Sequence, residues 1–451
     1  MGSINRVLVA NRGEIALRII RACRELGIET VQVYSEADRH SLPVQLADRS
    51  ICIGPVRSSE SYLNSTALIS AALTQGADAI HPGYGFLAEN AEFARRCEQE
   101  NLKFIGPSSE VIKLMGNKAE ARKKAAEIGV PTTPGSPGPV SGADEALAIA
   151  QEIGFPVILK ASAGGGGRGM RVVSKQGELR ESFDSAKAEA KAAFADDAIY
   201  LEKYLMKIRH IEIQILADAS SVLHLGERDC SMQRRNQKLV EESPSSALSS
   251  QLRDKIADTA VRLAKYVGYT SAGTVEFILD EESGHFYFME MNTRIQVEHT
   301  VTEMVTGIDL VKKQIQIASG EPLGLTQEEI HFNGNAIECR INAEDYERDF
   351  MPSPGKITQY IPSGGPGIRI DSHIFSGYQV PPYYDSLLGK VIAWGNTRDE
   401  AITRMSRALR DLRIEGVSTT IPFHQMLINH EKFRSGKFNT RFVQDTFFKS
   451  I

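Results

Sequence analysis

Polar and apolar residues alternate one by one over residues 286–299. The polar positions share one face of an extended backbone, and they are Glu290, Asn292, Arg294, Gln296 and Glu298. At roughly 3.3 Å per residue this face runs about 26 Å if the segment stays extended. A sheet edge with one solvated face is the alternative interpretation, but asparagine is a poor strand former. The pattern therefore predicts an extended segment that carries a functional site.

Short apolar runs alternate with helical spacing in the first 107 residues. Residues 7–10, 30–34, 79–80 and the region of Phe104 are expected strands, and Ile15, Ile19, Cys23 and Leu26 recur at helical spacing before Gly27. This order predicts an open parallel sheet with a ligand at the carboxyl ends of its strands. A dinucleotide site is disfavoured, because the first turn has one glycine and lacks the GxGxxG pattern.

A glycine run lies between two apolar strands in the middle of the chain. Residues 108–130 are expected to form a helical connector, and the Pro- and Gly-rich residues 131–139 mark a boundary. A helix is expected at 144–153, with strands at 156–160 and 171–173. Residues 161–170 lack a P-loop pattern and predict a hairpin with a mobile glycine tip that approaches phosphates. A plain flexible turn is the alternative, but Lys160 and Arg168 favour the phosphate interpretation.

Further elements are expected up to the alternating segment. They are helices at 179–193 and 250–267, strands at 198–205 and 210–215, and a hairpin that joins 274–278 to the strand from Phe286. A polar run at 227–238 has the composition of a solvated loop, yet we expect it to carry Gln, Asn and Lys side chains toward the chemistry.

Glu276 is expected to lie near Glu290 across that hairpin. Two close carboxylates repel each other unless a cation lies between them, so the pair predicts a metal site. Glu276 on a solvated strand face is the alternative.

Composition narrows the class of protein. A chain of 451 residues is expected to form about two or three domains, and 42% hydrophobic with 24% charged residues is typical of soluble globular proteins. The net charge of −5 gives no general attraction to nucleic acid or anionic membranes, and no apolar run is long enough to span a bilayer. The start lacks a signal-peptide core, and the five scattered cysteines lack a CxxC pair. We therefore expect a cytoplasmic protein with reduced thiols and no zinc site.

Four motifs occur in a characteristic order. They are HPGYGF at 81–86, KASAGGGGRGM at 160–170, ERDCSMQRR at 227–235 and EMNTRIQVEH at 290–299. Together they resemble the biotin carboxylases, which belong to the ATP-grasp superfamily, and the likeness covers nearly the whole chain. The resemblance implies an α/β ATP-grasp fold. Its expected parts are an N-terminal open parallel α/β domain (1–107), a helical connector (108–130), a glycine-flap lid domain (131–204) and a C-terminal mixed α+β domain (205–451).

The resemblance also implies roles for individual residues. Those expected to bind ATP are Lys118, Lys160, Gly166, Gly167, Glu202, Lys203, Leu205, His210, Gln233 and Asn236, where Asn236 replaces a common histidine. Those expected to hold Mg²⁺ or Mn²⁺ are Glu276, Glu290 and Asn292. Those expected to hold bicarbonate are Lys238, Arg294, Gln296 and the amide of Val297, while Glu298 takes its proton. Arg340 is expected to stabilise a biotin enolate, and Tyr84 to lie close to biotin.

The implied reaction is ATP- and bicarbonate-dependent carboxylation of biotin through carboxyphosphate. No Ala/Val-Met-Lys-Met biotin-attachment motif occurs, so a separate biotin carboxyl carrier protein and a carboxyltransferase are the expected partners. Acetyl-CoA carboxylase is the expected assembly; a pyruvate or other acyl-CoA carboxylase, or a different ATP-grasp ligase, is the alternative. A catalytically silent scaffold is disfavoured, because Lys160, Glu276 and Glu290 are all present. A homodimer is also expected, since Arg21, Glu25 and Arg369 match the family's contact, although Pro366 replaces an aromatic residue.

Overall fold

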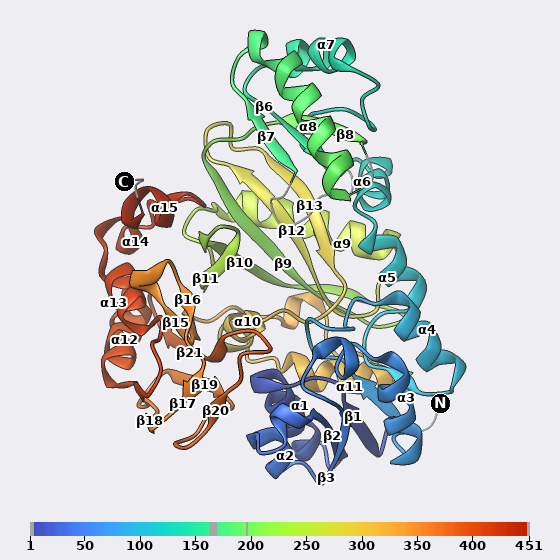
Figure 1. The fold of residues 1–451 in the computed structure, drawn as a ribbon, viewed down its shortest axis with the longest axis vertical. Helices are drawn as coiled ribbons and strands as arrows, with labels where there is room; N and C mark the ends of the chain where they lie inside the picture. Colours follow the sequence, from blue (N-terminus) through green and yellow to red (C-terminus); the bar gives the residue numbers. More distant parts are fainter. Residues whose placement is uncertain (1–3, 162–168, 195–196, 449–451) are drawn as a thin grey trace.

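An N-terminal parallel sheet forms the base of the molecule in Figure 1. The structure is a computed structural model that describes residues 4–161, 169–194 and 197–448. The sheet has the strand order β3-β2-β1-β4-β5, and all its pairings are parallel. Its strands are β1 (Arg6–Val9), β2 (Glu29–Ser35), β3 (Arg49–Gly54), β4 (Ala79–His81) and β5 (Lys103–Phe104), and its helices are α1 (Gly13–Glu25), α2 (Leu42–Leu46), α3 (Ser65–Thr74) and α4 (Ala91–Gln99).

The predicted parallel sheet is confirmed, and so is the helix after its first turn. Ile15, Ile19 and Cys23 of α1 are fully buried, as their helical spacing requires. The carboxyl ends of β1 and β4 lead into the turns at 11–14 and 82–86, which bring Glu14 and Tyr84 to the central cavity. This is the edge at which open α/β sheets bind their ligands.

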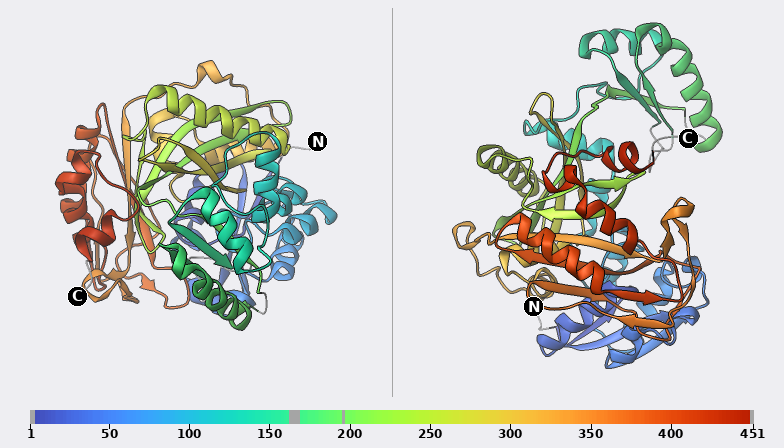
Figure 2. Two further views of the ribbon diagram at one scale, coloured as in Figure 1. Left: turned by 90° about the horizontal axis from the view of Figure 1, so that it is seen from above. Right: turned by 90° about the vertical axis from the view of Figure 1, so that its left-hand side faces the viewer.

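A small lid projects from the body of the molecule (Figure 2). It is reached through the connector helices α5 (Ser109–Gly116) and α6 (Lys118–Glu127), where Asn117 caps α6. Its antiparallel sheet contains β6 (Val157–Ala161), β7 (Met170–Val173) and β8 (Ile199–Lys203), with helices α7 (Ala143–Ile153) and α8 (Leu179–Phe194). The pairing of β6 with β7 confirms the predicted hairpin. Its tip, which includes Gly166 and Gly167, lies outside the described residues.

One antiparallel sheet spans the rest of the body in the order β13-β12-β9-β10-β11-β14-β21-β19. Its strands are β9 (Ile208–Ala217), β10 (Val222–Arg234), β11 (Gln237–Ser243), β12 (Ser271–Asp280), β13 (Phe286–Asn292), β14 (Asn335–Asn342), β19 (Ile368–Ser372) and β21 (Leu387–Gly395). Helix α9 (Ser250–Tyr266) packs on β9 and β10, and α12 (Arg398–Asp411) packs on β21. The remaining helices of this part are α10 (His299–Thr306), α11 (Leu310–Ser319), α13 (Ile421–Asn429), α14 (Glu431–Arg434) and α15 (Phe442–Phe447).

Short strands complete the C-terminal part. They are β15 (Glu344–Asp345), β16 (Met351–Pro352), β17 (Gly355–Lys356), β18 (Gln359–Ile361), β20 (Gln379–Val380) and β22 (Arg413–Glu415).

The polar run at 227–238 forms the end of β10 and the start of β11, joined by a turn at Arg235 and Asn236 with φ of 48° and 66°. As expected, it brings Gln233, Asn236 and Lys238 to the central cavity. Its Arg228 and Lys238 side chains bond to Gln214 and Glu212 of β9 inside the protein. One expectation about local structure is wrong, because the extended segment ends early, at Asn292. Beyond it, the Thr293 amide donates to Glu89 at 3.1 Å and the chain turns into α10 at His299, so no strand partner is needed.

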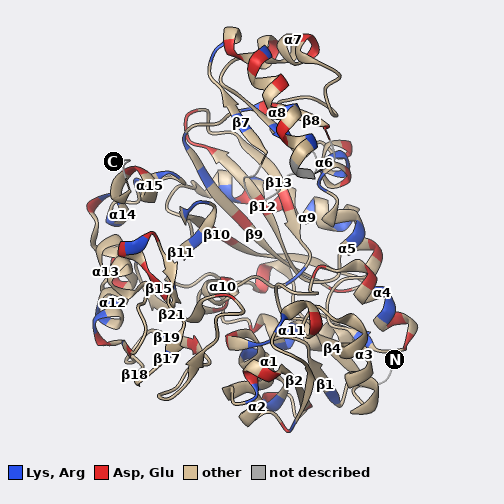
Figure 3. Ribbon diagram, viewed as in Figure 1, with Lys and Arg blue, Asp and Glu red and all other residues tan. Residues whose placement is uncertain are grey.

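Lys and Arg are interspersed with Asp and Glu over the elements in Figure 3. Within the described ranges, every helix is too short or too polar to cross a bilayer. All five cysteines are free thiols, and four of them are buried.

Candidate active site

A cavity of 2040 Å³ is lined by residues from the N-terminal sheet, the connector, the lid and the large antiparallel sheet. It is larger than a typical small-molecule site of about 300–1,000 Å³, so it has room for more than one substrate. The predicted site residues that line it are Tyr84, Lys118, Lys160, Glu202, His210, Gln233, Asn236, Lys238, Glu276, Glu290, Asn292, Arg294, Gln296, Val297, Glu298 and Arg340. Lys203 and Leu205 do not line it, and the Lys203 ammonium instead donates to the carbonyl oxygens of Gly154 and Phe155.

Lys238 contacts three carboxylates in the buried half of this cavity. Its Nζ lies 2.7 Å from Glu212, 3.1 Å from Glu276 and 2.6 Å from Glu298. Burial alone would lower the pKa of Lys238, but the surrounding anionic groups raise it well above its ordinary value. The side chain is therefore a fixed ammonium, and it holds three carboxylates at one point of the cavity.

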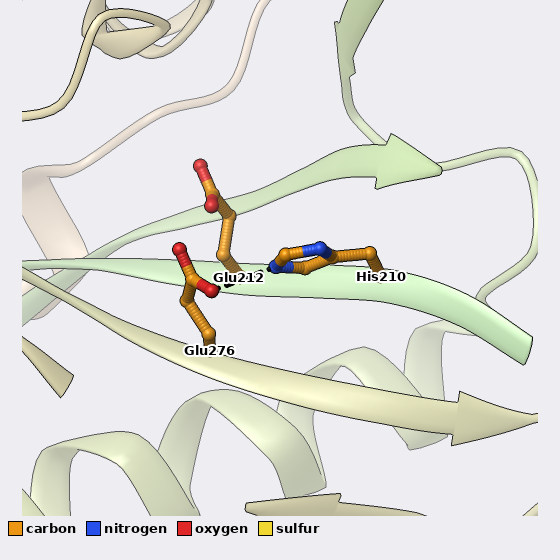
Figure 4. Close-up of side chains that lie close together, drawn as sticks. All are labelled: His210, Glu212 and Glu276. Carbon is orange, nitrogen blue, oxygen red and sulfur yellow. Dashed lines mark hydrogen bonds and ion pairs between the residues drawn. The ribbon is translucent and has the colours of Figure 1, made fainter. Parts of the chain in front are cut away.

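Glu276 accepts hydrogen bonds from several directions. His210 Nε2 lies 2.9 Å from its Oε2, and the amides of Asn292 and Gln296 donate to its Oε1 at 2.8 and 2.6 Å. Figure 4 shows the His210 ring and the Glu276 carboxylate meeting between β9 and β12, with Glu212 beside them. Burial would raise the pKa of Glu276, but Lys238 and His210 hold it well below its ordinary value. This carboxylate is ionised at neutral pH and suits a cation.

Glu290 lies directly opposite Glu276 in the pairing of β12 with β13. The predicted proximity of these two residues across the hairpin is confirmed at the level of strand register. The Glu290 side chain is 32% exposed and forms a 3.1 Å ion pair with Lys118 at the start of α6. Glu276 and Glu290 thus project toward the cavity from neighbouring strands, while a cation from the connector approaches from the other side.

The loop at residues 293–298 places an amide, a guanidinium and a carboxylate in the cavity. Arg294 is held between Asn292, whose Oδ1 is 3.1 Å from the guanidinium, and Glu89, whose Oε2 is 2.8 Å from Nε. The buried Arg228 guanidinium donates a hydrogen bond of 2.9 Å to Oε1 of Gln296 and fixes the orientation of this amide. Burial of Arg228 is compensated by hydrogen bonds to Glu212, Gln214, Thr274 and Thr302.

Glu298 closes this loop as a carboxylate between two cations. Lys238 reaches its Oε1, and Arg340 reaches its Oε2 at 2.9 Å. Burial would raise the pKa of Glu298, but these cations together with Arg228 hold it well below the usual range. Arg340 is itself held by Glu241 through an Nε hydrogen bond of 2.7 Å. Burial raises the pKa of Glu241 to about 7.

On the lid side of the cavity, two lysines expected to bind ATP are more exposed than Lys238. Lys160 at the end of β6 and Arg122 of α6 both donate to Glu202 of β8. Lys160 is 36% exposed and Lys118 is 70% exposed, so both ammonium groups remain accessible from the cavity. Gln233 and Asn236 reach the cavity from the end of β10 and the turn that follows it.

Several partners in the site were missed in the sequence. Glu212 shares a strand face with His210 and Gln214, so the alternation of β9 would have identified it. Glu89, Arg122 and Glu241 had no such signal, because each contacts its partner over a long separation in the chain. Cys230 also lies in this network, with its Sγ 3.8 Å from Glu298, and burial raises its pKa well above the ordinary value.

The sequence of this chain matches known protein families and relatives over almost its whole length. The profile for "Biotin carboxylase, N-terminal domain" matches residues 3–112, "Carbamoyl-phosphate synthase L chain, ATP binding domain" matches 117–326, and "Biotin carboxylase C-terminal domain" matches 338–445. Biotin carboxylase 1 of Bacillus subtilis is 59% identical over 442 residues, which is 98% of each chain. The chain belongs to the biotin carboxylase family.

Solved structures of this family share the whole fold. A biotin carboxylase from Campylobacter jejuni, solved as a β-γ-ATP complex, has a TM-score of 0.93 and 50% identity, and the match covers 98% of this chain and 99% of the other. The biotin carboxylase domain of the Hydrogenobacter thermophilus 2-oxoglutarate carboxylase, solved as a dimer with MgADP, ADP and bicarbonate, has a TM-score of 0.91 and 51% identity over 99% and 98% of the chains. The α/β ATP-grasp fold predicted from the motifs is therefore confirmed.

Proposed function

We propose that this chain uses ATP and bicarbonate to carboxylate biotin carried by a separate protein. The observation that carries the proposal is the single cavity in which the loop at 293–298 faces Lys238 and Arg340 while Lys118 and Lys160 face the same space. One side suits a small anion beside a base, and the other suits a phosphate chain.

The first step is attack of a bicarbonate oxygen on the γ-phosphorus of ATP. The bond from that phosphorus to the bridging oxygen breaks, so that ADP leaves and carboxyphosphate forms. Arg294, Gln296, Lys238 and the Val297 amide hold the anion, and Glu298 accepts its proton. The ionised state of Glu298 supports this role, because only an ionised carboxylate accepts a proton. A base works best with a pKa near the working pH, so we expect bound bicarbonate to raise the pKa of Glu298.

The second step follows when carboxyphosphate divides into CO₂ and phosphate. The phosphate takes the N–H proton of biotin, and the resulting enolate captures CO₂ through its nitrogen. The Arg340 guanidinium stabilises the enolate oxygen, and Tyr84 lies beside the biotin ring. The position of Arg340 beside Glu298, at 2.9 Å, supports this arrangement because an enolate held by Arg340 would lie next to the loop at 293–298.

Mg²⁺ or Mn²⁺ fits the carboxylate and amide oxygens of Glu276, Glu290 and Asn292. Hard divalent cations prefer oxygen ligands of this kind, and the opposed register of Glu276 and Glu290 supports a shared ion. When bound, such an ion would offset negative charge on the phosphate oxygens. Lys118, Lys160, Glu202, His210, Gln233 and Asn236 line the cavity and would bind ATP. Lys203 and Leu205 do not line it and would contribute backbone groups of the Glu202 segment, while Gly166 and Gly167 lie outside the described residues.

We place the domain boundaries at 107, 130 and 204, and the continuous sheet from β9 to β21 supports treating 205–451 as one unit. The chain acts in the cytoplasm as the biotin carboxylase subunit of acetyl-CoA carboxylase, in fatty acid biosynthesis, with a biotin carboxyl carrier protein and a carboxyltransferase. The second candidate is a carboxylase with a different final acceptor, such as pyruvate or another acyl-CoA. It is supported because one similar solved structure is the biotin carboxylase domain of a 2-oxoglutarate carboxylase.

A homodimer is supported by neighbouring residues on one surface. Arg21 and Glu25 of α1 are exposed, and α1 packs against β19, which carries Arg369. Pro366 lies just before β19, and sedimentation of wild type and an Arg21→Glu variant would measure the strength of this contact.

Phosphate release with ATP, Mg²⁺ and free biotin tests the function. We expect release that requires bicarbonate and rises with biotin, together with formation of carboxybiotin. ATP turnover that is independent of both bicarbonate and biotin would instead identify a different ATP-grasp ligase.

A further inference from the structure

Lys390 of β21 is a fully buried lysine directly beneath the active-site cavity. Its side chain has no exposed surface, and it does not line the cavity itself. Its Nζ donates to the carbonyl oxygen of Val297 at 2.6 Å. This carbonyl belongs to the peptide bond that leads into Glu298, so the ammonium bonds directly to the backbone of the loop that presents the base.

The same ammonium also faces the N-terminal sheet. It lies 3.2 Å from Oε1 of Glu14, a residue in the first turn of α1 that is equally buried. Glu14 Oε1 in turn accepts a hydrogen bond from the hydroxyl of Tyr84. A continuous chain of polar contacts thus runs from Val297 through Lys390 and Glu14 to Tyr84, and it joins the loop at 293–298 to the turn at 82–86.

The charge state of this chain agrees with its geometry. Burial would lower the pKa of Lys390, but Glu14, Glu338 and Asp371 raise it above the ordinary value, so the lysine is an ammonium at neutral pH. Burial raises the pKa of Glu14, and Lys390 opposes that effect. Asp371 is already paired with Arg369 at 2.6 Å, and Glu338 accepts from Thr300, which leaves Glu14 and Val297 as the direct partners of Lys390.

We propose that Lys390 is a positioning residue that fixes the bicarbonate loop and the biotin-facing Tyr84 relative to each other. The inference rests on the proposed function, since it assigns the two loops to the two substrates. A displacement of about 1 Å of a positioned group costs on the order of 10² in rate, and Lys390 is the shared anchor of two such groups. It acts through Val297 and Tyr84 and touches neither substrate.

Replacing both partners of a buried ion pair can separate a positioning role from a purely stabilising one. Removing one partner leaves an uncompensated buried charge, which unfolds or destabilises the protein, whereas replacing both partners with neutral residues of similar size is often close to neutral in stability. The informative variant is therefore Lys390→Met combined with Glu14→Gln. The glutamine carbonyl still accepts from Tyr84, but the link to Val297 is broken.

The experiment compares this double variant with wild type in two assays on the full chain. The first is bicarbonate-dependent phosphate release without biotin, and the second is carboxylation of free biotin. We expect a thermal midpoint close to that of wild type, an ATP KM within about twofold, and kcat/KM for bicarbonate and for biotin each lowered at least about tenfold. Arg398→Met is the matched control, because it breaks a buried ion pair with Glu242 at 2.9 Å and lowers stability without touching either loop.

The outcomes separate the inference from the proposed function. Kinetic constants of the double variant equal to those of wild type, with wild type active, would overturn the positioning role. Loss of activity in proportion to loss of folded protein, as in the Arg398→Met control, would also overturn it. If wild type itself shows no bicarbonate-dependent turnover, the proposed function fails, and the positioning role fails with it.

Discussion

The two halves of the cavity hold their charges in different ways. On the side proposed to bind bicarbonate, Lys238 is 14% exposed and touches three carboxylates, of which Glu298 also pairs with Arg340. On the side proposed to bind the nucleotide, Lys118 is 70% exposed and pairs with Glu290. The first half is therefore preorganised by the fold, and the second consists of accessible cations that a phosphate chain can take over from their carboxylates.

Under the proposed function, this difference lets one site bind two anions of different size. Preorganised dipoles and charges favour a small anion whose charge changes during the reaction, because nothing has to reorganise at that moment. A large polyphosphate needs room to enter. An exposed ion pair contributes only about 0–1 kcal/mol to stability, so its cation can readily leave the carboxylate and bind a phosphate instead.

The largest expected effect comes from the preorganised half. Glu298→Ala or Arg294→Ala should lower the rate of biotin carboxylation by ~10²–10³, because each removes a charge that acts on the reacting anion. Steady-state kinetics with ATP, bicarbonate and free biotin measure the effect. Near-normal carboxylation by either variant would contradict the assigned roles.

The second-largest effect is expected on the free energy of unfolding, which should differ between variants in the two halves of the cavity. Lys238→Met leaves Glu212, Glu276 and Glu298 without their shared ammonium, and losing a buried partner costs about 3–5 kcal/mol. Lys160→Met should change the free energy of unfolding by less than ~1 kcal/mol, since Lys160 is 36% exposed and Glu202 keeps Arg122. Urea denaturation compares the two, and equal losses of stability would remove the distinction drawn between the halves.

Acid should weaken the region behind Arg340. His424 of α13 is fully buried with its Nε2 2.7 Å from the Arg340 carbonyl oxygen, and burial lowers the pKa of His424 to about 4. Between pH ~6.5 and that value the unfolded chain binds a proton that the folded protein does not, so the free energy of unfolding falls as pH falls, by up to ~1.4 kcal/mol per pH unit from this group. His424→Gln should flatten the dependence over this window, and an unchanged slope would show that the group does not contribute.

The smallest effect is expected at the turn on the nucleotide side. Asn236 is exposed at φ 66°, a conformation that histidine also tolerates. Asn236→His should change the KM for ATP by less than about tenfold, because one neutral hydrogen bond contributes about 0.5–1.5 kcal/mol. A larger change, seen by initial-rate kinetics, would show that this turn does more than contact the ribose.

The sequence predicted those parts of the site that lie along one strand or one hairpin. The alternation in β13 identified Glu290 and Asn292, and the hairpin predicted that Glu276 faces Glu290. The same alternation failed beyond Asn292, because a tertiary contact from Glu89 and the start of α10 replace strand pairing there.

Residues joined only by the fold could not be predicted. Glu89 lies 205 positions from Arg294, and Lys390 lies 93 positions from Val297. Neither has a local pattern that distinguishes it from an ordinary surface charge or strand residue. The buried pairing of polar residues in β10 and β11 was hidden for the same reason, since their partners Glu212 and Gln214 lie on another strand.

Transfer of oxygen from ¹⁸O-labelled bicarbonate tests the central claim most directly. If a bicarbonate oxygen attacks the γ-phosphorus and the carboxyphosphate then breaks at its C–O bond, the released phosphate carries one ¹⁸O from bicarbonate. We predict one labelled oxygen per phosphate formed in the presence of biotin. Phosphate without the label, with its new oxygen drawn from water, would contradict the account.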